Sequence, residues 1–197
     1  MTRIIGGTAG GRRLETPRGQ ATRPTSDRVR EALFSAVESR CGSLDGLRFL
    51  DLYAGSGAVG LEAWSRGAGV VTLVEQDRRT ASLITRNATG LGFSRAHVVA
   101  APVSSVLHST PRAPYDVVFS DPPYAVTDEQ VTLDLDSLVV HDWLVPGALV
   151  VVERPGRRSE VTWPDGIEGD RTKRYGETAL WYGHACAEPS APGPSTP

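Results

Sequence analysis

From residue 47 onward, short apolar runs alternate with segments whose apolar residues recur at helical spacing. A run that is apolar throughout suits a strand buried on both faces, and helices between such strands cover the two faces of a parallel sheet. The sequence therefore predicts a doubly wound α/β fold. The expected strands are 47–52, 70–75, 96–99, 115–120 and 148–153, and the expected helices are 58–66, 78–90, 103–109 and 127–141.

The two ends of the chain depart from this alternation. Residues 3–16 pair β-branched residues with a Gly-rich turn, which predicts a hairpin, and 26–40 reads as a helix capped by Thr25 or Ser26. Near the other end, 159–163 and 178–184 are expected to form an antiparallel hairpin that closes the sheet. We therefore divide the chain into an extension (1–42), a main domain (43–186) and a Pro-rich, disordered tail (187–197).

Composition excludes several classes of protein. No run approaches the roughly 18 apolar residues of a membrane helix, and the first residues carry no apolar signal segment. Cys41 and Cys186 lie 145 residues apart, and histidines 97, 108, 141 and 184 show no metal-ligand spacing. We expect a soluble, cytoplasmic protein without a metal site, and a monomer by default.

Charge is unevenly distributed although the net charge is only −2. Residues 1–30 contain seven arginines against two acids, a local balance of +5, whereas 113–153 contain eight acids and no Lys or Arg. An arginine-dense, Gly-rich arm suits contact with a phosphate backbone. A solvated hairpin without a partner explains the charge equally well, so charge alone leaves both interpretations open.

A glycine-rich loop follows the first expected strand. Gly55, Gly57 and Gly60 match the G-x-G-x-x-G pattern between a strand and a helix, and Glu75 ends the next strand 20 residues after Gly55. A carboxylate at that place can accept both hydroxyls of a ribose, which predicts an adenosine cofactor. The spacing fits a dinucleotide or S-adenosylmethionine, and Asp51 suits the cationic amino-acid part of the latter better than a phosphate.

The tetrapeptide Asp121-Pro122-Pro123-Tyr124 follows a later strand and should reach the same edge of the sheet. The Asp121 carboxylate and the Pro122 carbonyl can accept hydrogen bonds from an exocyclic amine, and Tyr124 offers a face for stacking a base. Such groups would orient the amine nitrogen toward an incoming methyl group, with Asp121 as a possible proton acceptor.

These motifs resemble the class I S-adenosylmethionine-dependent amino-methyltransferases, and more closely the bacterial 16S rRNA guanine-N2 methyltransferases of the guanine-966 type. The resemblance covers about residues 3–184. It rests on the Asp-Pro-Pro-Tyr motif and on these segments: 3–7 with 11–14, 23–34, 51–68 and 174–178.

The resemblance implies a Rossmann-like fold with seven strands, mostly parallel with an antiparallel last strand, preceded by a hairpin and helix. It implies that 121–124 hold the target guanine of 16S rRNA in the small subunit or an assembly intermediate. The implied S-adenosylmethionine ligands are Asp51, Tyr53, Ala54, Gly55, Ser56, Gly57, Glu75, Gln76, Ala101 and Asp121. The implied RNA contacts are Arg3, Arg12, Arg13, Arg23, Thr25, Arg28 and Arg30.

Two positions depart from the family pattern. The family commonly has Asn or Asp after the third strand, where this chain has Ala100-Ala101-Pro102, so the adenine amine would meet backbone or water there. Gln76 replaces a usually apolar neighbour of the ribose acid. Asn87, near the end of an expected helix, is interpreted as a cap.

Several functions remain alternatives to guanine methylation of rRNA. Adenine N6 in DNA or a glutamine amide in protein would suit the same amine chemistry. A nicotinamide-dependent oxidoreductase fits the glycine spacing and Glu75 but leaves Asp121–Tyr124 without a role. A non-catalytic rRNA-binding assembly factor is a third class.

Overall fold

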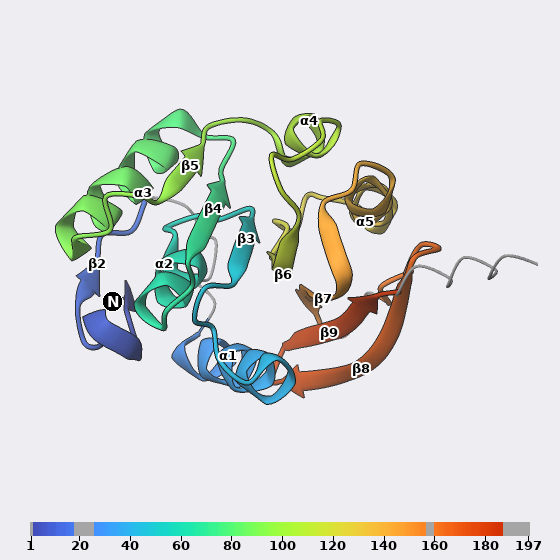
Figure 1. The fold of residues 1–197 in the computed structure, drawn as a ribbon, viewed down its shortest axis with the longest axis horizontal. Helices are drawn as coiled ribbons and strands as arrows, with labels where there is room; N and C mark the ends of the chain where they lie inside the picture. The colour runs from blue at the N-terminus through green and yellow to red at the C-terminus, as the bar shows by residue number, and fades with distance from the viewer. Residues whose placement is uncertain (1, 18–25, 157–159, 187–197) are drawn as a thin grey trace, which may run out of the picture.

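A seven-stranded sheet runs through the middle of the protein in the computed structural model, which describes residues 2–17, 26–156 and 160–186 (Figure 1). The strand order is β5-β4-β3-β6-β7-β9-β8. The first five strands in this order are parallel, and β9 is antiparallel to both β7 and β8. This confirms the fold class and the antiparallel last strand. The strands are β3 (Arg48–Leu52), β4 (Val70–Val74), β5 (His97–Val99), β6 (Tyr115–Ser120), β7 (Leu144–Pro155), β8 (Ile167–Tyr175) and β9 (Thr178–Ala185).

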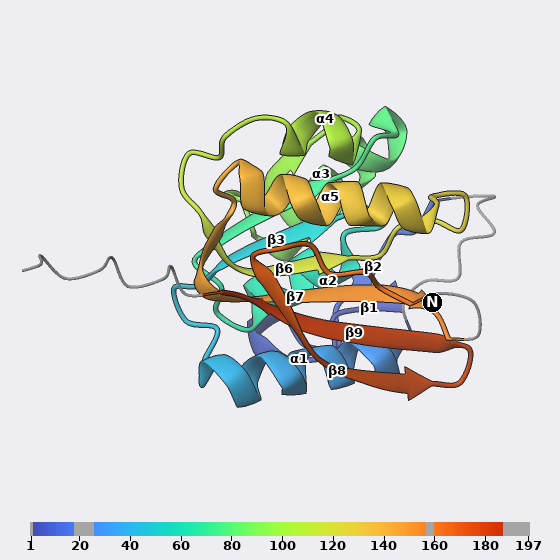
Figure 2. The same ribbon diagram turned by 90° about the vertical axis from the view of Figure 1, so that its right-hand side faces the viewer.

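Helices cover both faces of the sheet (Figures 1 and 2). Successive residues of a strand point to opposite faces, so Phe49 packs in the hydrophobic cluster under α1, α2 and α3, whereas Leu50 packs in the cluster under α4 and α5. No helix in the described part of the chain is long and apolar enough to cross a membrane. The helices are α1 (Asp27–Cys41), α2 (Ala58–Ser65), α3 (Arg78–Leu91), α4 (Val103–Leu107) and α5 (Asp128–Val140).

The first helix begins where its capping residue predicts. The Ser26 hydroxyl accepts a hydrogen bond from the backbone N–H of Val29 at 3.3 Å, which satisfies one of the free donors at the helix start. Of the two expected caps, Ser26 is therefore confirmed, and Thr25 lies outside the described residues. Val29, Leu33 and Val37 are buried on one face, as their spacing predicts.

The prediction of a strand at 159–163 is wrong. Residues 160–164 are not in a strand, and the partner of β9 is instead β8, which lies in the polar stretch between the two expected strands. Figure 2 shows β8 at the edge of the sheet. Most of its side chains are exposed, so it shows none of the apolar alternation that marks a half-buried strand.

The expected N-terminal hairpin is present but short. β1 (Thr2–Arg3) pairs with β2 (Arg13–Leu14), and a 3₁₀ turn, η1 (Gly7–Ala9), lies between them. Gly7 has φ +72°, and a Cβ atom there would lie 1.8 Å from the Ser65 carbonyl oxygen. Only glycine fits this contact, because the turn lies directly against the end of α2.

A buried carboxylate on α2 holds the hairpin in place. Glu62 is 0% exposed and accepts hydrogen bonds from the backbone N–H groups of Ile5 (2.6 Å) and Gly6 (2.7 Å). The guanidinium of Arg66 donates to the same carboxylate at 2.9 Å. Arg30 is also 0% exposed and places Nη1 3.9 Å from Glu62. The Arg30 guanidinium is buried beside a carboxylate and does not reach the surface, so the expected RNA contact by Arg30 is wrong.

The division at residue 42 stays a prediction about function, because the extension and the sheet share one core. Ile4 and Leu14 of the hairpin and Leu33 of α1 belong to the same hydrophobic cluster as Phe119 of β6 and Val151 of β7.

We predict that Glu62→Ala lowers the free energy of unfolding by about 3–5 kcal/mol, because it leaves Arg66 Nε and two backbone donors without their acceptor. It also removes the carboxylate that lies 3.9 Å from the buried Arg30 Nη1. Urea unfolding measures the change. Glu38 also pairs with Arg66, at 3.0 Å, but its side chain is 46% exposed, so Glu38→Ala is the matched control and should cost at most about 1 kcal/mol. Equal losses in the two variants would contradict the role given to Glu62.

Candidate active site

A cavity of about 810 Å³ opens at the carboxyl edge of the sheet. The chain leaves β3 for β4 and β5 on one side, then returns to place β6 beside β3. Ligands of open α/β sheets bind at such a switch in strand order. Leu52 pairs with Ser120, so the loops that follow β3 and β6 start at the same level and both line the cavity.

The loop after β3 is held by two carboxylates. The Glu75 carboxylate accepts a hydrogen bond from Gly55 N–H at 3.0 Å, and Asp51 accepts one from Gly60 N–H at 2.8 Å. Gly55 has φ +55° and no atom within 4 Å of where a Cβ would lie, so its backbone is open to an approaching ligand. The loop thus presents backbone groups and acids to one side of the cavity.

The acids that line the cavity make it electronegative. Burial raises the pKa of Asp51 to about 8; the bond from Gly60 opposes this shift, and the charges of Asp121 and Glu75 add to it. Burial also raises the pKa of Glu75, against hydrogen bonds from the backbone of Asp77 and Gly55. The Glu75 and Asp121 carboxylates, together with the Asp51 carboxyl, suit a ligand that carries positive charge and has hydroxyls to donate, because a nearby cation favours the ionised form of each acid. This fits S-adenosylmethionine better than a dinucleotide.

The Asp-Pro-Pro-Tyr segment lines the side of the cavity opposite the glycine loop. Asp121, Pro122, Pro123 and Tyr124 all line the cavity, and Asp121 N–H donates to the Leu52 carbonyl at 3.4 Å, which extends the pairing of the two strands. Tyr124 is 76% exposed, an unusual state for a large aromatic side chain. Its ring is therefore available to a partner from outside.

The structure brings together most, but not all, of the expected cofactor ligands. Gly57 and Ala101 are not among the described residues that line the cavity. Gly57 caps α2 with φ +79°, and a Cβ there would meet the Ile84 side chain at 2.8 Å, so this glycine serves helix packing. Val103, at the start of α4, lines the cavity. The residues that do meet are Asp51, Tyr53, Ala54, Gly55, Ser56, Glu75, Gln76 and Asp121.

Asn87 has a role that the sequence analysis missed, because it is not a cap. Its amide oxygen accepts from Glu15 N–H at 2.9 Å, and its amide nitrogen donates to the carbonyls of Glu15 (3.0 Å) and Ser56 (3.1 Å). Asn87 thereby ties the end of the hairpin to the glycine loop. The local sequence around Asn87 gives no signal for these contacts, because Glu15 and Ser56 lie far from it in the chain.

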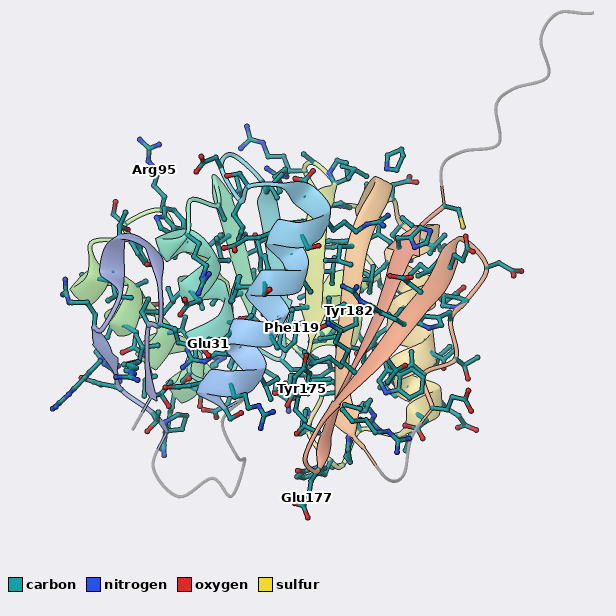
Figure 3. All side chains as sticks on the ribbon, turned by 90° about the horizontal axis from the view of Figure 1, so that it is seen from below. Glu31, Arg95, Phe119, Tyr175, Glu177 and Tyr182 are labelled. Atoms are coloured by element: carbon teal, nitrogen blue, oxygen red, sulfur yellow. The ribbon has the colours of Figure 1, made fainter. Side chains whose placement is uncertain are left out.

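Residues from both ends of the chain complete the cavity wall. Figure 3 shows Tyr175 beside α1 and Glu177 protruding from the tip between β8 and β9, with Arg95 at the other end of the molecule. Ser26, Val29 and Tyr175–Thr178 in this wall had a sequence signal, because they lie in segments 23–34 and 174–178 of the family resemblance. The lining residues outside the two motifs are Thr16, Pro17, Ser26, Val29, Val103, Phe119, Ala125, Glu153, Arg154, Pro155, Tyr175, Gly176, Glu177 and Thr178.

Of the residues expected to contact RNA, some lie on the described surface of the extension and others fall outside the described residues. Arg3, Arg12, Arg13 and Arg28 are described on the extension, and all four are exposed. Arg3 lies 3.3 Å from Asp27, and Arg12 donates to the Gly90 carbonyl, whereas Arg13 lies on β2 opposite Arg3. Arg23 and Thr25 lie outside the described residues.

A family model described as Conserved hypothetical protein 95 matches residues 2–184. The chain belongs to this family. It is 37% identical over 182 residues to Ribosomal RNA small subunit methyltransferase D of Escherichia coli strain K12, covering 90% of this chain and 86% of that protein. It is 36% identical to the protein of the same name in Haemophilus influenzae, over 77% of each chain. These relatives confirm the resemblance inferred from the motifs.

Solved structures agree with this family membership. An Escherichia coli protein described as a methyltransferase, yhhF, has a TM-score of 0.82 and 33% identity, covering 95% of this chain and 99% of its own. A hypothetical protein of Thermus thermophilus, TTHA0928, has a TM-score of 0.76 and 35% identity, covering 92% of this chain and 98% of its own.

We predict that the buried Asp51 makes the protein less stable as pH rises. Its pKa is about 8 when folded and about 4 when unfolded, so between these values the folded protein retains a proton that the unfolded chain releases. The free energy of unfolding should fall with rising pH over this range, by at most about 1.4 kcal/mol per unit.

Asp51→Asn should remove this slope, and urea unfolding from pH 5 to pH 8 measures it. Asn retains an oxygen that can accept from Gly60 N–H. Asp170→Asn, at an exposed position on β8, is the control and should leave the slope unchanged. Parallel stability curves for wild type and Asp51→Asn would show that the Asp51 carboxyl is not protonated in the folded protein.

Proposed function

We propose that this protein transfers a methyl group from S-adenosylmethionine to the exocyclic N2 of a guanine in 16S rRNA. The observation that carries the proposal is the meeting of the glycine loop and the Asp-Pro-Pro-Tyr segment at one cavity. The names of the Escherichia coli and Haemophilus influenzae relatives support rRNA of the small subunit as the substrate. The same names give no support to a nicotinamide-dependent oxidoreductase.

The cofactor would occupy the side of the cavity formed by the glycine loop. Glu75 is placed to accept the ribose hydroxyls, and the Asp121 carboxylate balances positive charge. A cationic ligand beside Asp51 would favour release of the proton that this buried carboxyl holds in the folded protein. Ala54 and Gly55 present backbone atoms, and Val103 offers an apolar contact for a ring. When bound, S-adenosylmethionine supplies an electrophilic methyl group on a sulfonium centre.

The target base would enter on the side of the cavity formed by Asp121–Tyr124. The Asp121 carboxylate and the Pro122 carbonyl accept hydrogen bonds from the exocyclic amine, which directs the nitrogen lone pair toward the cofactor side. The exposed Tyr124 ring stacks on the base, a contact worth about 1–3 kcal/mol in proteins that bind single strands. Asp121 then accepts the proton that the methylated amine releases.

The arginines of the extension would bind the RNA backbone. The hairpin end is tied to the glycine loop through Asn87, and Thr16, Pro17 and Ser26 line the cavity, so the extension borders the place where the base enters. Charged side chains on this arm can therefore hold phosphates while the base reaches Asp121. The structural context favours the RNA interpretation of the arm over a hairpin without a partner.

We predict that Asp121→Ala lowers methyl transfer to undermethylated 30S particles by about 100-fold or more, because it removes an acceptor that orients the amine. Tritium transfer into RNA measures the rate, and filter binding measures affinity for the particles. Affinity should change little, because the arm remains. Unchanged transfer would contradict the catalytic role. Lost binding by the folded variant, with no transfer by either the variant or wild type, would instead support an assembly factor.

We predict that Arg13→Gln weakens RNA binding and makes the slope of log affinity against log salt shallower by about one. The substitution spares the bond from Arg12 to Gly90. Arg95→Gln is the control, since Arg95 lies at the opposite end of the molecule from Glu177 (Figure 3). Identical slopes for the two variants would exclude Arg13 from the interface.

A further inference from the structure

The turn after β3 contains a residue in an unfavourable backbone conformation. Tyr53 has φ +62°, in the left-handed region that glycine favours and bulky side chains avoid. It lines the cavity immediately before Ala54 and Gly55, whose backbone would face the cofactor. Something must stabilise this conformation, because a tyrosine does not adopt it unaided.

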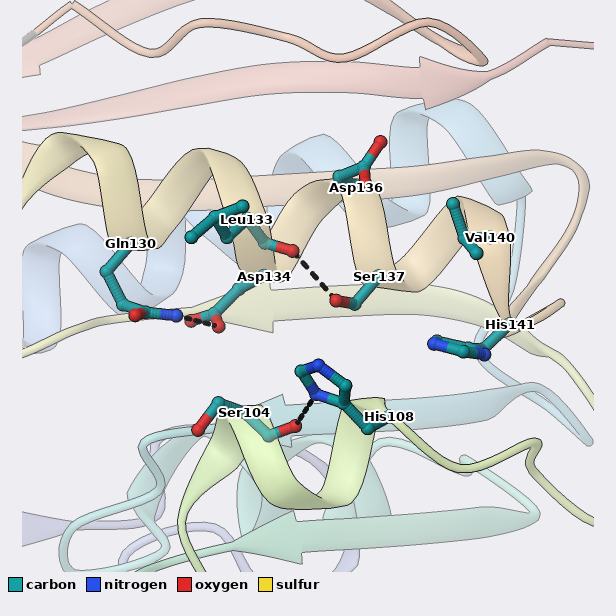
Figure 4. A pocket seen from close by; sticks show the side chains of 9 residues that line it. All are labelled: Ser104, His108, Gln130, Leu133, Asp134, Asp136, Ser137, Val140 and His141. Carbon is teal, nitrogen blue, oxygen red and sulfur yellow. Dashed lines mark hydrogen bonds between the residues drawn. The ribbon is translucent and has the colours of Figure 1, made fainter.

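The stabilising contact comes from α5. The Tyr53 hydroxyl donates a 2.5 Å hydrogen bond to the carboxylate of Asp134, which is only 4% exposed. Burial raises the pKa of the Tyr53 hydroxyl, so it remains a donor at neutral pH. The second carboxylate oxygen of Asp134 accepts from the Gln130 amide at 3.0 Å (Figure 4). Both oxygens of Asp134 are therefore engaged, and the Tyr53 ring is fixed at its far end.

The helix that carries Asp134, α5, is itself held next to the Asp121–Tyr124 segment. Arg154, at the end of β7, donates to the Asp128 carboxylate at 2.6 Å and to the Val126 carbonyl at 3.3 Å. Val126 lies between Tyr124 and α5, and Asp128 is the first residue of that helix. Arg154 therefore binds the segment after Asp121–Tyr124 to β7. Asp134 connects α5, which follows that segment, to the turn before the glycine loop.

We propose that Asp134 is a positioning residue for cofactor binding. Through the Tyr53 hydroxyl it holds the turn that presents Ala54 and Gly55 to the cavity, and so sets the affinity for the cofactor. This inference rests on the proposed cofactor site. It goes beyond the motif residues, because Asp134 lies 81 positions from Tyr53 and outside both motifs.

The test compares Tyr53→Phe, Asp134→Ala and the double variant by calorimetric titration with S-adenosylhomocysteine, which needs no RNA substrate. Each single variant should bind about tenfold more weakly, the effect of losing one hydrogen bond to a charged group. The double variant should bind no more weakly than either single one, because both remove the same contact. In methyl transfer, the KM for S-adenosylmethionine should rise while kcat changes less than about twofold.

Two control substitutions separate positioning from general stability. Tyr115→Phe also removes a buried tyrosine hydrogen bond, 2.7 Å to Thr72, but Tyr115 lies at the start of β6, away from the cavity. Asp136→Asn changes an exposed acid of α5 that Figure 4 shows turned away from the Gln130–Asp134 pair. Both controls should bind S-adenosylhomocysteine within about twofold of wild type.

Binding by Tyr53→Phe indistinguishable from wild type, or additive losses in the double variant, would overturn the role of Asp134 while leaving the proposed function intact. If wild type itself fails to bind S-adenosylhomocysteine, the proposed cofactor site and this inference both fail.

Discussion

The parallel pairing of β3 with β6 is the constraint on which the site depends. Asp51 lies opposite Phe119 and Leu52 opposite Ser120, so two segments far apart in the chain leave the sheet side by side. A shift of one residue in this register would turn the side chains of one strand to the other face. The apolar clusters on both faces of the sheet prevent such a shift, and thus the core fixes the geometry of the cavity.

The extension depends on polar contacts as much as on apolar ones. A buried carboxylate is stable only where donors surround it, and Glu62 has them from the hairpin backbone and from Arg66. This arrangement fixes the arm against α2, and the Asn87 amide fixes its end against the glycine loop. The arm is therefore part of the architecture that borders the cavity, in a position to align an RNA strand with Asp121.

Much of the fold could be predicted because its buried strands and amphipathic helices carry local signals. The edge strand β8 could not, since most of its residues are exposed and polar and are ordered by pairing with β9. Among site residues, Gly55, Glu75 and Asp121–Tyr124 were predictable from spacing and chemistry, and the other loop positions from the family resemblance. The burial of Arg30, the inward packing of Gly57 and the bridge made by Asn87 depend on partners far away in sequence, which spacing does not reveal.

The most direct test of the account is the identity of the methylated product. The purified protein is incubated with labelled S-adenosylmethionine and undermethylated 30S particles, and the RNA is digested and analysed by nucleoside mass spectrometry. The account predicts labelled N2-methylguanosine from 16S rRNA. No label in the RNA, with label found instead on DNA adenine or on a protein glutamine, would contradict the rRNA substrate while preserving the amine chemistry of Asp121–Tyr124.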